Sequence, residues 1–229
     1  MASGTLSAPA PPFVMGVPSA ACSRADEVGT GTTILAVSYK GGVVLAADTR
    51  TSAGAYVVNR ASRKISKVHD KIYVCRSGSA ADTQALTQFV KYYLNIHSLE
   101  LGELPSVNTA ATLFQSFHYD YKDMLMSGLI VAGWDGKRGG QIYSLPIGGS
   151  KIKVNVTAGG SGSVYISGLI DALYKEDMTK EEAQQLALKL LSHAMARDAS
   201  SGGMVRMTTI SEDGVEETTF EGDKLPTPA

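Results

Sequence analysis

Cysteine is scarce in this sequence, and what there is cannot form a network of disulfides. Among 229 residues there are two cysteines, Cys22 and Cys75. Cys22 lies in an amino-terminal segment that we expect to be removed, for reasons given below. The single thiol that remains cannot pair within the chain, which fits a reducing compartment.

Long apolar runs and clustered charge of one sign are absent too. No apolar stretch approaches the ~20 residues of a membrane-spanning helix, so we expect no membrane partner. The 21 basic and 22 acidic residues give a net charge of −1 without any basic run, which argues against binding of nucleic acid. Four scattered histidines lack the spacing of a zinc site, and we expect neither a metal nor a cofactor.

The first 31 residues differ in composition from the rest. They are rich in Ala, Pro, Ser and Gly, and Arg24 is their only basic residue. A secretory signal needs a positive start and an unbroken apolar stretch, whereas prolines at positions 9, 11, 12 and 18 interrupt every apolar stretch here. We therefore expect a flexible leader over residues 1–31 that is removed, and one folded domain over residues 32–229.

Apolar patterning and turn residues predict the elements of this domain. Ser79 with Asp82 opens a helix that should run to about residue 96, and Thr179 with Glu182 forms a capping box for another. Further helices are expected over residues 109–125 and 163–174. Strands are expected over residues 33–39, 43–47, 64–68, 71–75, 129–134, 141–145, 151–157, 205–210 and 216–220.

The order of these elements favours a layered α+β domain. Both arms of the first hairpin are apolar on both faces, so their sheet should be covered on both sides. Runs of strands separated by pairs of helices are satisfied by two sheets stacked face to face, with a helix pair on each outer side.

Polar residues and glycines form motifs near the ends of several of these elements. The motifs are Gly29-Thr30-Gly31-Thr32-Thr33, Asp48-Thr49-Arg50, Lys64 after Asn59-Arg60, Arg76-Ser77-Gly78-Ser79-Ala80-Ala81-Asp82, Gly159-Gly160-Ser161-Gly162-Ser163 and Arg197-Asp198-Ala199-Ser200-Ser201-Gly202-Gly203. Each alone has an ordinary explanation as a turn, a loop or a solvated charge. In this order and spacing, over Thr32 to roughly Gly222, they resemble the proteasome beta-type subunits, and among these most the caspase-like catalytic subunit, beta type one.

The resemblance implies a fold, an assembly and a location. The fold is a four-layer αββα sandwich of the N-terminal-nucleophile hydrolase type, which agrees with the layer order read from the elements. Members of the family assemble in seven-membered rings, with two beta rings stacked between two alpha rings. Other beta subunits and alpha-ring subunits are thus the expected partners, polypeptides the substrates, and the cytoplasm and nucleus the location.

Thr32 can carry a peptidase reaction by itself once it is the first residue. A threonine hydroxyl is a poor nucleophile at neutral pH and needs a base nearby. An α-amino group has a pKa of about 7.7–8.0, close to the pH at which a general base works best. Thr32 therefore carries nucleophile and base together after the bond between Gly31 and Thr32 is cut.

The resemblance assigns roles to the surrounding polar residues. Lys64 corresponds to the lysine beside the hydroxyl, whose charge lowers neighbouring pKa values. Asp48 corresponds to the aspartate that pairs with this lysine and orients it. The backbone N–H of Gly78 corresponds to the oxyanion donor. The polar group around the terminal amine corresponds to Ser161, Asp198 and Ser201.

Two further positions bear on substrate binding. Arg76 matches the position that lines the pocket for the residue before the cut bond, and the caspase-like subunit has a basic residue there and prefers acidic substrates. Ser52 stands in the segment that pairs with substrate through its backbone, where threonine is usual. Arg63 precedes Lys64 where an acidic residue is common, and it alters the local charge.

Two other functions have to be weighed against an active peptidase. A structural ring subunit never matures, but such subunits lack the terminal threonine or the lysine, whereas this chain has both and Gly31 as well. The bacterial two-ring peptidase shares the architecture, but Arg76 and the long helix pairs favour the eukaryotic type of beta subunit.

Overall fold

The first hairpin of the domain is buried on both faces, as its apolar arms predict. The computed structural model describes residues 31–226, so the expected leader lies outside the described residues except for Gly31. Strands β1 (Ile34–Tyr39) and β2 (Gly42–Asp48) pair antiparallel, and every residue of β2 is buried. These two strands form the centre of a five-stranded sheet.

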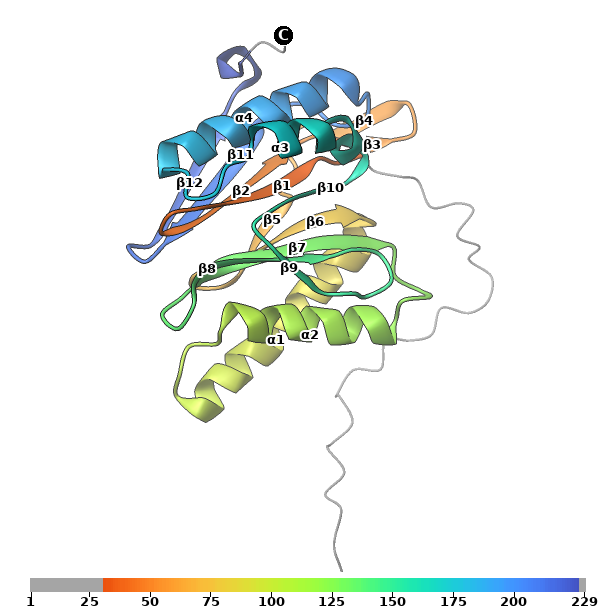
Figure 1. Ribbon diagram of the computed structural model, residues 1–229. Helices are drawn as coiled ribbons and strands as arrows, with labels where there is room; N and C mark the ends of the chain where they lie inside the picture. The colour runs from red at the N-terminus through yellow and green to blue at the C-terminus, as the bar shows by residue number, and fades with distance from the viewer. Residues whose placement is uncertain (1–30, 227–229) are drawn as a thin grey trace, which may run out of the picture.

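The two large sheets are each five-stranded and antiparallel, and they lie face to face (Figure 1). In the first, the order is β10-β1-β2-β11-β12, with β10 at Val156–Gly159, β11 at Val205–Ser211 and β12 at Val215–Phe220. In the second, the order is β5-β6-β7-β8-β9, and the bounds are Ile65–His69, Ile72–Gly78, Ser127–Asp135, Gly139–Leu145 and Ile152–Val154.

A helix pair covers the outer face of each sheet (Figure 1). Helices α1 (Ala80–Leu101) and α2 (Val107–Asp120) pack on the second sheet through a core that includes Val90, Phe114 and Leu129. Helices α3 (Ser167–Leu173) and α4 (Lys180–Arg197) cover the first sheet through a core that includes Leu35 and Leu190. A third core, with Ile34, Leu45 and Ile130, fills the space between the sheets. The predicted αββα sandwich is confirmed.

Both predicted helix caps are present. The Ser79 side chain accepts a hydrogen bond from the backbone N–H of Asp82, and Thr179 and Glu182 form both bonds of a capping box. Helix α1 runs five residues beyond the predicted end near residue 96, because Gly102 in the left-handed conformation terminates it only there. Helix α2 begins at Val107 and ends at Asp120, so the predicted end at residue 125 was wrong.

Two predicted elements need correction, and one strand pair was not predicted. The single strand predicted over residues 151–157 is two strands, since β9 pairs with β8 in the second sheet while β10 pairs with β1 in the first. The helix predicted over residues 163–174 consists of a 3-10 turn at Ser161–Tyr165 followed by α3. The small hairpin of β3 (Thr51–Ala53) and β4 (Tyr56–Asn59) was not predicted as a strand pair.

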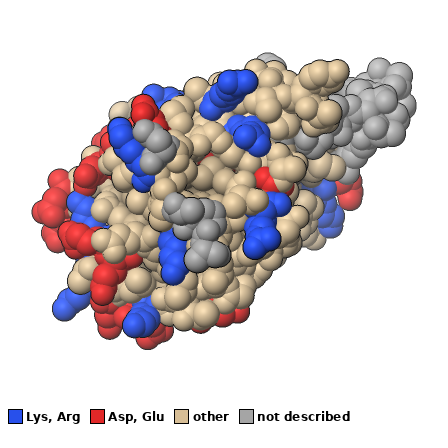
Figure 2. Space-filling view, turned by 90° about the horizontal axis from the view of Figure 1, so that it is seen from above, with Lys and Arg blue, Asp and Glu red and all other residues tan. Residues whose placement is uncertain are grey.

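The surface over the α3 and α4 layer carries both signs of charge. In Figure 2, which views this face, Lys and Arg side chains are dispersed among uncharged residues, and acidic side chains gather mainly toward the left end. No helix within residues 31–226 is long and apolar enough to cross a membrane.

Candidate active site

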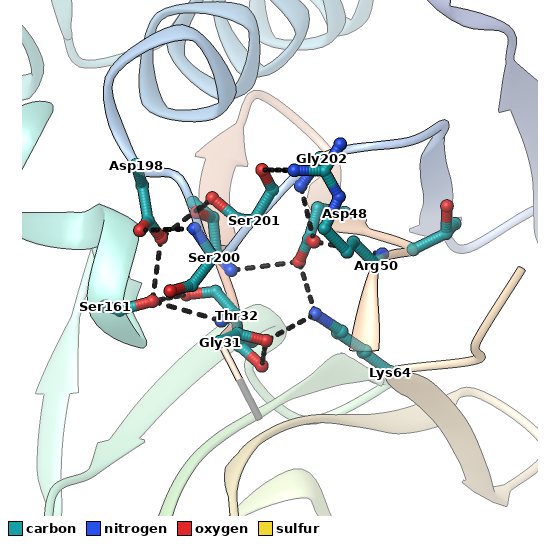
Figure 3. Close-up of polar contacts among 12 residues, drawn as sticks. Gly31, Thr32, Asp48, Arg50, Lys64, Ser161, Asp198, Ser200, Ser201 and Gly202 are labelled. Atoms are coloured by element: carbon teal, nitrogen blue, oxygen red, sulfur yellow. Dashed lines mark hydrogen bonds and ion pairs between the residues drawn. The ribbon is translucent and has the colours of Figure 1, made fainter. Parts of the chain in front are cut away.

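Thr32 lies two residues before the start of β1, and only 4% of it is exposed to solvent. Its Oγ1 donates a hydrogen bond to the carbonyl oxygen of Gly31 at 2.5 Å, and its backbone N–H donates to Ser161 Oγ at 3.1 Å. Figure 3 shows Gly31 and Thr32 between Ser161 on one side and Lys64 on the other. The hydroxyl and the nitrogen of Thr32 thus face different sets of polar groups.

Lys64 and Asp48 form a buried ion pair beside this residue. Lys64 Nζ lies 2.7 Å from Asp48 Oδ1 and donates to the Gly31 carbonyl oxygen at 2.9 Å. Asp48 ends β2 in the first sheet, whereas Lys64 precedes β5 in the second, so the pair joins the two sheets. Burial lowers the pKa of the Lys64 ammonium from its ordinary value, and the Asp48 charge opposes that shift.

The Asp48 carboxylate accepts hydrogen bonds at both oxygens, and three of its four donors are backbone N–H groups. Oδ1 accepts from the Lys64 ammonium and from the backbone N–H of Thr33 at 2.9 Å. Oδ2 accepts from the backbone N–H of Arg50 at 3.1 Å and from that of Gly202 at 3.0 Å. Asp48 is fully buried, so these four donors compensate for the loss of water around its charge.

A second carboxylate, that of Asp198, organises the side of the site that faces the Thr32 nitrogen. Asp198 Oδ2 accepts from the hydroxyl groups of Ser161 at 2.7 Å and Ser201 at 2.9 Å, and Oδ1 accepts from the backbone N–H of Ser200 at 3.0 Å. The Ser201 oxygen in turn accepts from the Thr33 hydroxyl at 2.9 Å. This network connects the end of α4 to the start of β1.

Gly31 and Gly78 both occupy conformations that favour glycine. Gly31 has φ of 56°, and a Cβ there would lie 2.3 Å from the Cβ of Ser200. Gly78 ends β6 with φ of 95°, and a Cβ there would lie 2.2 Å from the carbonyl oxygen of Met126. A side chain at either position would be strained and would collide with backbone or neighbouring atoms.

Arg76 lies in β6, two residues before Gly78, and its backbone N–H donates to the carbonyl oxygen of Lys64 at 2.9 Å. Its guanidinium donates to Ser66 Oγ at 3.1 Å, to Thr83 Oγ1 at 3.3 Å and to the Arg63 carbonyl oxygen at 2.6 Å. These bonds use three of its five N–H groups and leave one on each terminal nitrogen. The side chain is therefore held in place while keeping two donors for another group.

Ser52 is in the middle of β3, where 7% of it is exposed, and it lies opposite Val57 of β4. Its side chain is turned into the protein, so any contact with a ligand would come from the strand's backbone. The loop before β5 carries Arg63, whose side chain is exposed and whose carbonyl group contacts Arg76.

Several residues of the site were quoted in motifs but given no role by the sequence. Arg50 and Gly202 both donate backbone N–H groups to Asp48, and Thr33 links Asp48 to the Asp198 network. The only sign in the sequence that these residues belong to the site was their position within the quoted motifs. The pattern of residue types could not show which backbone groups converge on one carboxylate.

A groove of about 570 Å³ opens beside Thr32 between the ends of the two sheets. Gly31, Thr32, Gly78 and Ser161 lie along one part of it, and apolar residues such as Met126 and Ile147 line another. Neither Arg76 nor Lys64 lines this groove. Thr32 therefore lies between the buried ion pair of Lys64 and Asp48 and this uncharged groove.

The chain matches the family model described as "Proteasome subunit" over residues 28–210. It belongs to the proteasome beta-type subunit family. Proteasome subunit beta type-6 of Dictyostelium discoideum is 50% identical over 201 residues, which are 88% of this chain and 94% of that protein. Proteasome subunit beta type-9 of Salmo salar is 50% identical over 202 residues, 88% of this chain and 93% of the relative.

A third relative has another type number. The probable proteasome subunit beta type-1 of Schizosaccharomyces pombe is 50% identical over 200 residues, which are 87% of this chain and 88% of that protein. The beta-type relatives thus include types 6, 9 and 1 at the same level of identity, and the type is not decided by similarity alone. In the part of this beta-type subunit that the structure describes, no group of three or more His, Cys, Asp or Glu side chains could hold a metal ion.

Proposed function

We propose that this chain is the precursor of a threonine endopeptidase subunit of the proteasome core particle, activated by its own cleavage between Gly31 and Thr32. One observation carries the proposal. The Gly31 carbonyl oxygen accepts a hydrogen bond from Thr32 Oγ1 at 2.5 Å and one from Lys64 Nζ at 2.9 Å. A carbonyl held by an ammonium beside a hydroxyl nucleophile is prepared for attack.

Self-cleavage would proceed by transfer of the leader to the hydroxyl and then to water. Thr32 Oγ1 adds to the Gly31 carbonyl carbon, while Lys64 stabilises the negative charge on the oxygen. The bond between carbon and nitrogen breaks, and the nitrogen takes the proton that Oγ1 loses. Water then hydrolyses the ester, which restores the hydroxyl, releases the leader as a carboxylate and leaves Thr32 with a free amino group.

The mature site would cleave substrates with the same groups. The free Thr32 amine takes the proton of Oγ1 as the oxygen attacks the substrate carbonyl, and it delivers the proton to the leaving nitrogen. Ser161, held by Asp198 and Ser201, orients that amine. Asp48 holds Lys64 beside the hydroxyl, and the Gly78 N–H stabilises the oxyanion. Hydrolysis of the acyl ester by water completes the cycle.

Substrate preference follows from the anchored Arg76 guanidinium. Its two remaining N–H groups suit a carboxylate, so we place it in the pocket for the residue before the cut bond, with a preference for acidic residues. The backbone of the Ser52 strand would pair with the substrate. This is the activity of the caspase-like subunit, beta type one, and its substrates would be unfolded polypeptides.

The names of the relatives support an assembled form. They are called proteasome subunits, so this chain is proposed to assemble with other beta subunits and with alpha-ring subunits in stacked seven-membered rings, in the cytoplasm and nucleus. Residues 1–31 would be its removable leader. The alternative is a structural ring subunit that never matures, and the assembled Thr32, Lys64 and Asp48 group argues against it.

Mass analysis of the chain in assembled particles tests the proposal. The wild-type chain should begin at Thr32, whereas Thr32→Ala and Lys64→Ala chains should keep Gly31 and cleave no peptides. Lys67→Ala is a matched control, since Lys67 lies three residues after Lys64, within β5, but pairs with the exposed Asp70. An intact leader in wild-type particles would instead favour the structural subunit.

A further inference from the structure

The groove beside Thr32 differs in character from the surroundings of Arg76. Its apolar wall consists of Met126, Leu129, Pro146 and Ile147, and no charged side chain lines it within residues 31–226. Ile147 is 67% exposed and Met126 39% exposed, so their apolar surfaces face solvent when the groove is empty. An apolar side chain that entered would remove this surface from water.

The position of the Thr32 nitrogen determines which part of a substrate would meet this groove. In the proposed mechanism, the Thr32 amine delivers a proton to the leaving nitrogen, which must therefore lie within hydrogen-bond reach of it. The Thr32 N–H donates a hydrogen bond to Ser161 Oγ, and Ser161 lines the groove. The chain that follows the cut bond thus departs along the side of Thr32 where the groove opens.

We propose that the groove binds the residue immediately after the cut bond and selects an apolar side chain there. This inference rests on the proposed function and adds to it a second requirement for the substrate. A charged side chain in the groove would lose water without gaining a partner of opposite charge, whereas Leu or Phe would bury the exposed parts of Ile147 and Met126. The site then recognises two substrate residues, an acidic one before the cut bond and an apolar one after it.

Internally quenched peptides with a common Glu before the cut test this inference in assembled particles whose other catalytic subunits are inactivated. The residue after the cut is varied among Leu, Gly, Lys and Asp, and kcat/KM is measured for each peptide. Leu should exceed Lys and Asp by about tenfold or more, with Gly in between. Equal rates for the four peptides would overturn the inference and leave the proposed function standing.

Substitution of the apolar wall provides the second part of the test. Ile147→Asp should reverse the order of the Leu and Lys peptides, because the new carboxylate gives the Lys side chain a partner. Ile152→Asp is the matched control, since Ile152 is 50% exposed in β9 and does not line the groove. It should keep the wild-type order, and an unchanged order in Ile147→Asp would refute the assignment. If wild-type particles cut none of the four peptides, the proposed function itself would be refuted.

Discussion

The guanidinium of Arg50 occupies the space that a side chain on Gly202 would need. A Cβ at residue 202 would lie 2.6 Å from Cζ of Arg50. Arg50 Nη1 also donates to the carbonyl oxygens of Ala199 at 3.2 Å and Ser201 at 3.3 Å. The side chain thus holds the loop after α4 against the end of β2, where the Gly202 N–H reaches Asp48.

This relationship predicts that substitutions at the two positions are not additive. A Cβ on residue 202 meets only the guanidinium of the flexible Arg50 side chain, so Gly202→Ala should push that guanidinium away from the carbonyl oxygens of Ala199 and Ser201. Removal of the leader and peptide cleavage should therefore slow by about as much as in Arg50→Ala, which loses the same hydrogen bonds. In the double variant no further bond is lost, so activity should equal that of Arg50→Ala. Extent of processing and kcat in assembled particles are the readouts, and additive losses would contradict the prediction.

The two buried carboxylates should respond differently to replacement by an amide. In Asp48→Asn, the amide NH₂ would face two groups that can only donate, and at least one of them is a backbone N–H in either orientation, so we expect a loss of about 3–5 kcal/mol in the free energy of unfolding. In Asp198→Asn, the NH₂ can donate to Ser161 and Ser201, whose hydroxyls can rotate, and the loss should be about 1 kcal/mol. Denaturant unfolding of the two variants measures the difference. Equal losses would show that donor geometry does not govern these sites.

Arg76→Met should abolish the preference for Glu before the cut while Leu peptides are still cleaved. The reason is that an aliphatic side chain offers no donors to a carboxylate. Arg63→Met is the control, because Arg76 contacts only the carbonyl group of Arg63 and the Arg63 side chain is exposed. Peptide reporters with Glu, Leu and Arg before the cut give the ranking. If Arg63→Met alone changed it, the acidic preference would belong to Arg63.

A buried histidine should give the fold a sensitivity to acid. His118 in α2 is fully buried, and its Nε2 is bonded to Ser127 Oγ at 2.8 Å, while its Nδ1 has no hydrogen-bond partner among the described residues. Burial lowers the pKa of His118 from 6.5, and the contact with Ser127 opposes the shift. The unfolded chain therefore binds a proton at a pH where the folded chain does not.

Its stabilising contribution is present above pH 6.5 and is lost as the pH falls from there toward the lowered pKa, by at most about 1.4 kcal/mol per pH unit. His118→Gln should reduce this slope of the free energy of unfolding between pH 7.5 and 5, whatever its effect on stability at pH 7.5. Denaturant titrations at several pH values would show it. A variant with the wild-type slope would exclude His118 as the source.

Much of the fold could be predicted because its signals are local. The Thr179 capping box and the alternation of Ile34 and Leu35 between two cores depend on neighbours within a turn or a strand. The division of residues 151–157 could not be predicted, because both halves alternate alike and the chain changes sheets between them. Strand β4 is exposed at all four positions and therefore has no buried face that a pattern could indicate.

The candidate site was predictable as a set of residues but not as a set of contacts. The Lys64 and Asp48 pair spans 16 residues and two sheets, and the Ser161 and Asp198 bond spans 37 residues. Resemblance to a family placed these side chains in one site. The convergence of the Arg50 and Gly202 backbones on Asp48 depends on how β2 meets the loop after α4, which no local pattern encodes.

The ion pair between Lys64 and Asp48 implies that folding precedes removal of the leader. Since its two members come from different sheets, Lys64 reaches its place beside the Gly31 carbonyl only when the sheets have docked. Under the proposed mechanism, a chain that is still folding therefore exposes no working nucleophile to its neighbours. Because cleavage is irreversible, loss of the leader would report that the two sheets have docked. The fraction of shortened chains as a function of time would then measure the rate of docking.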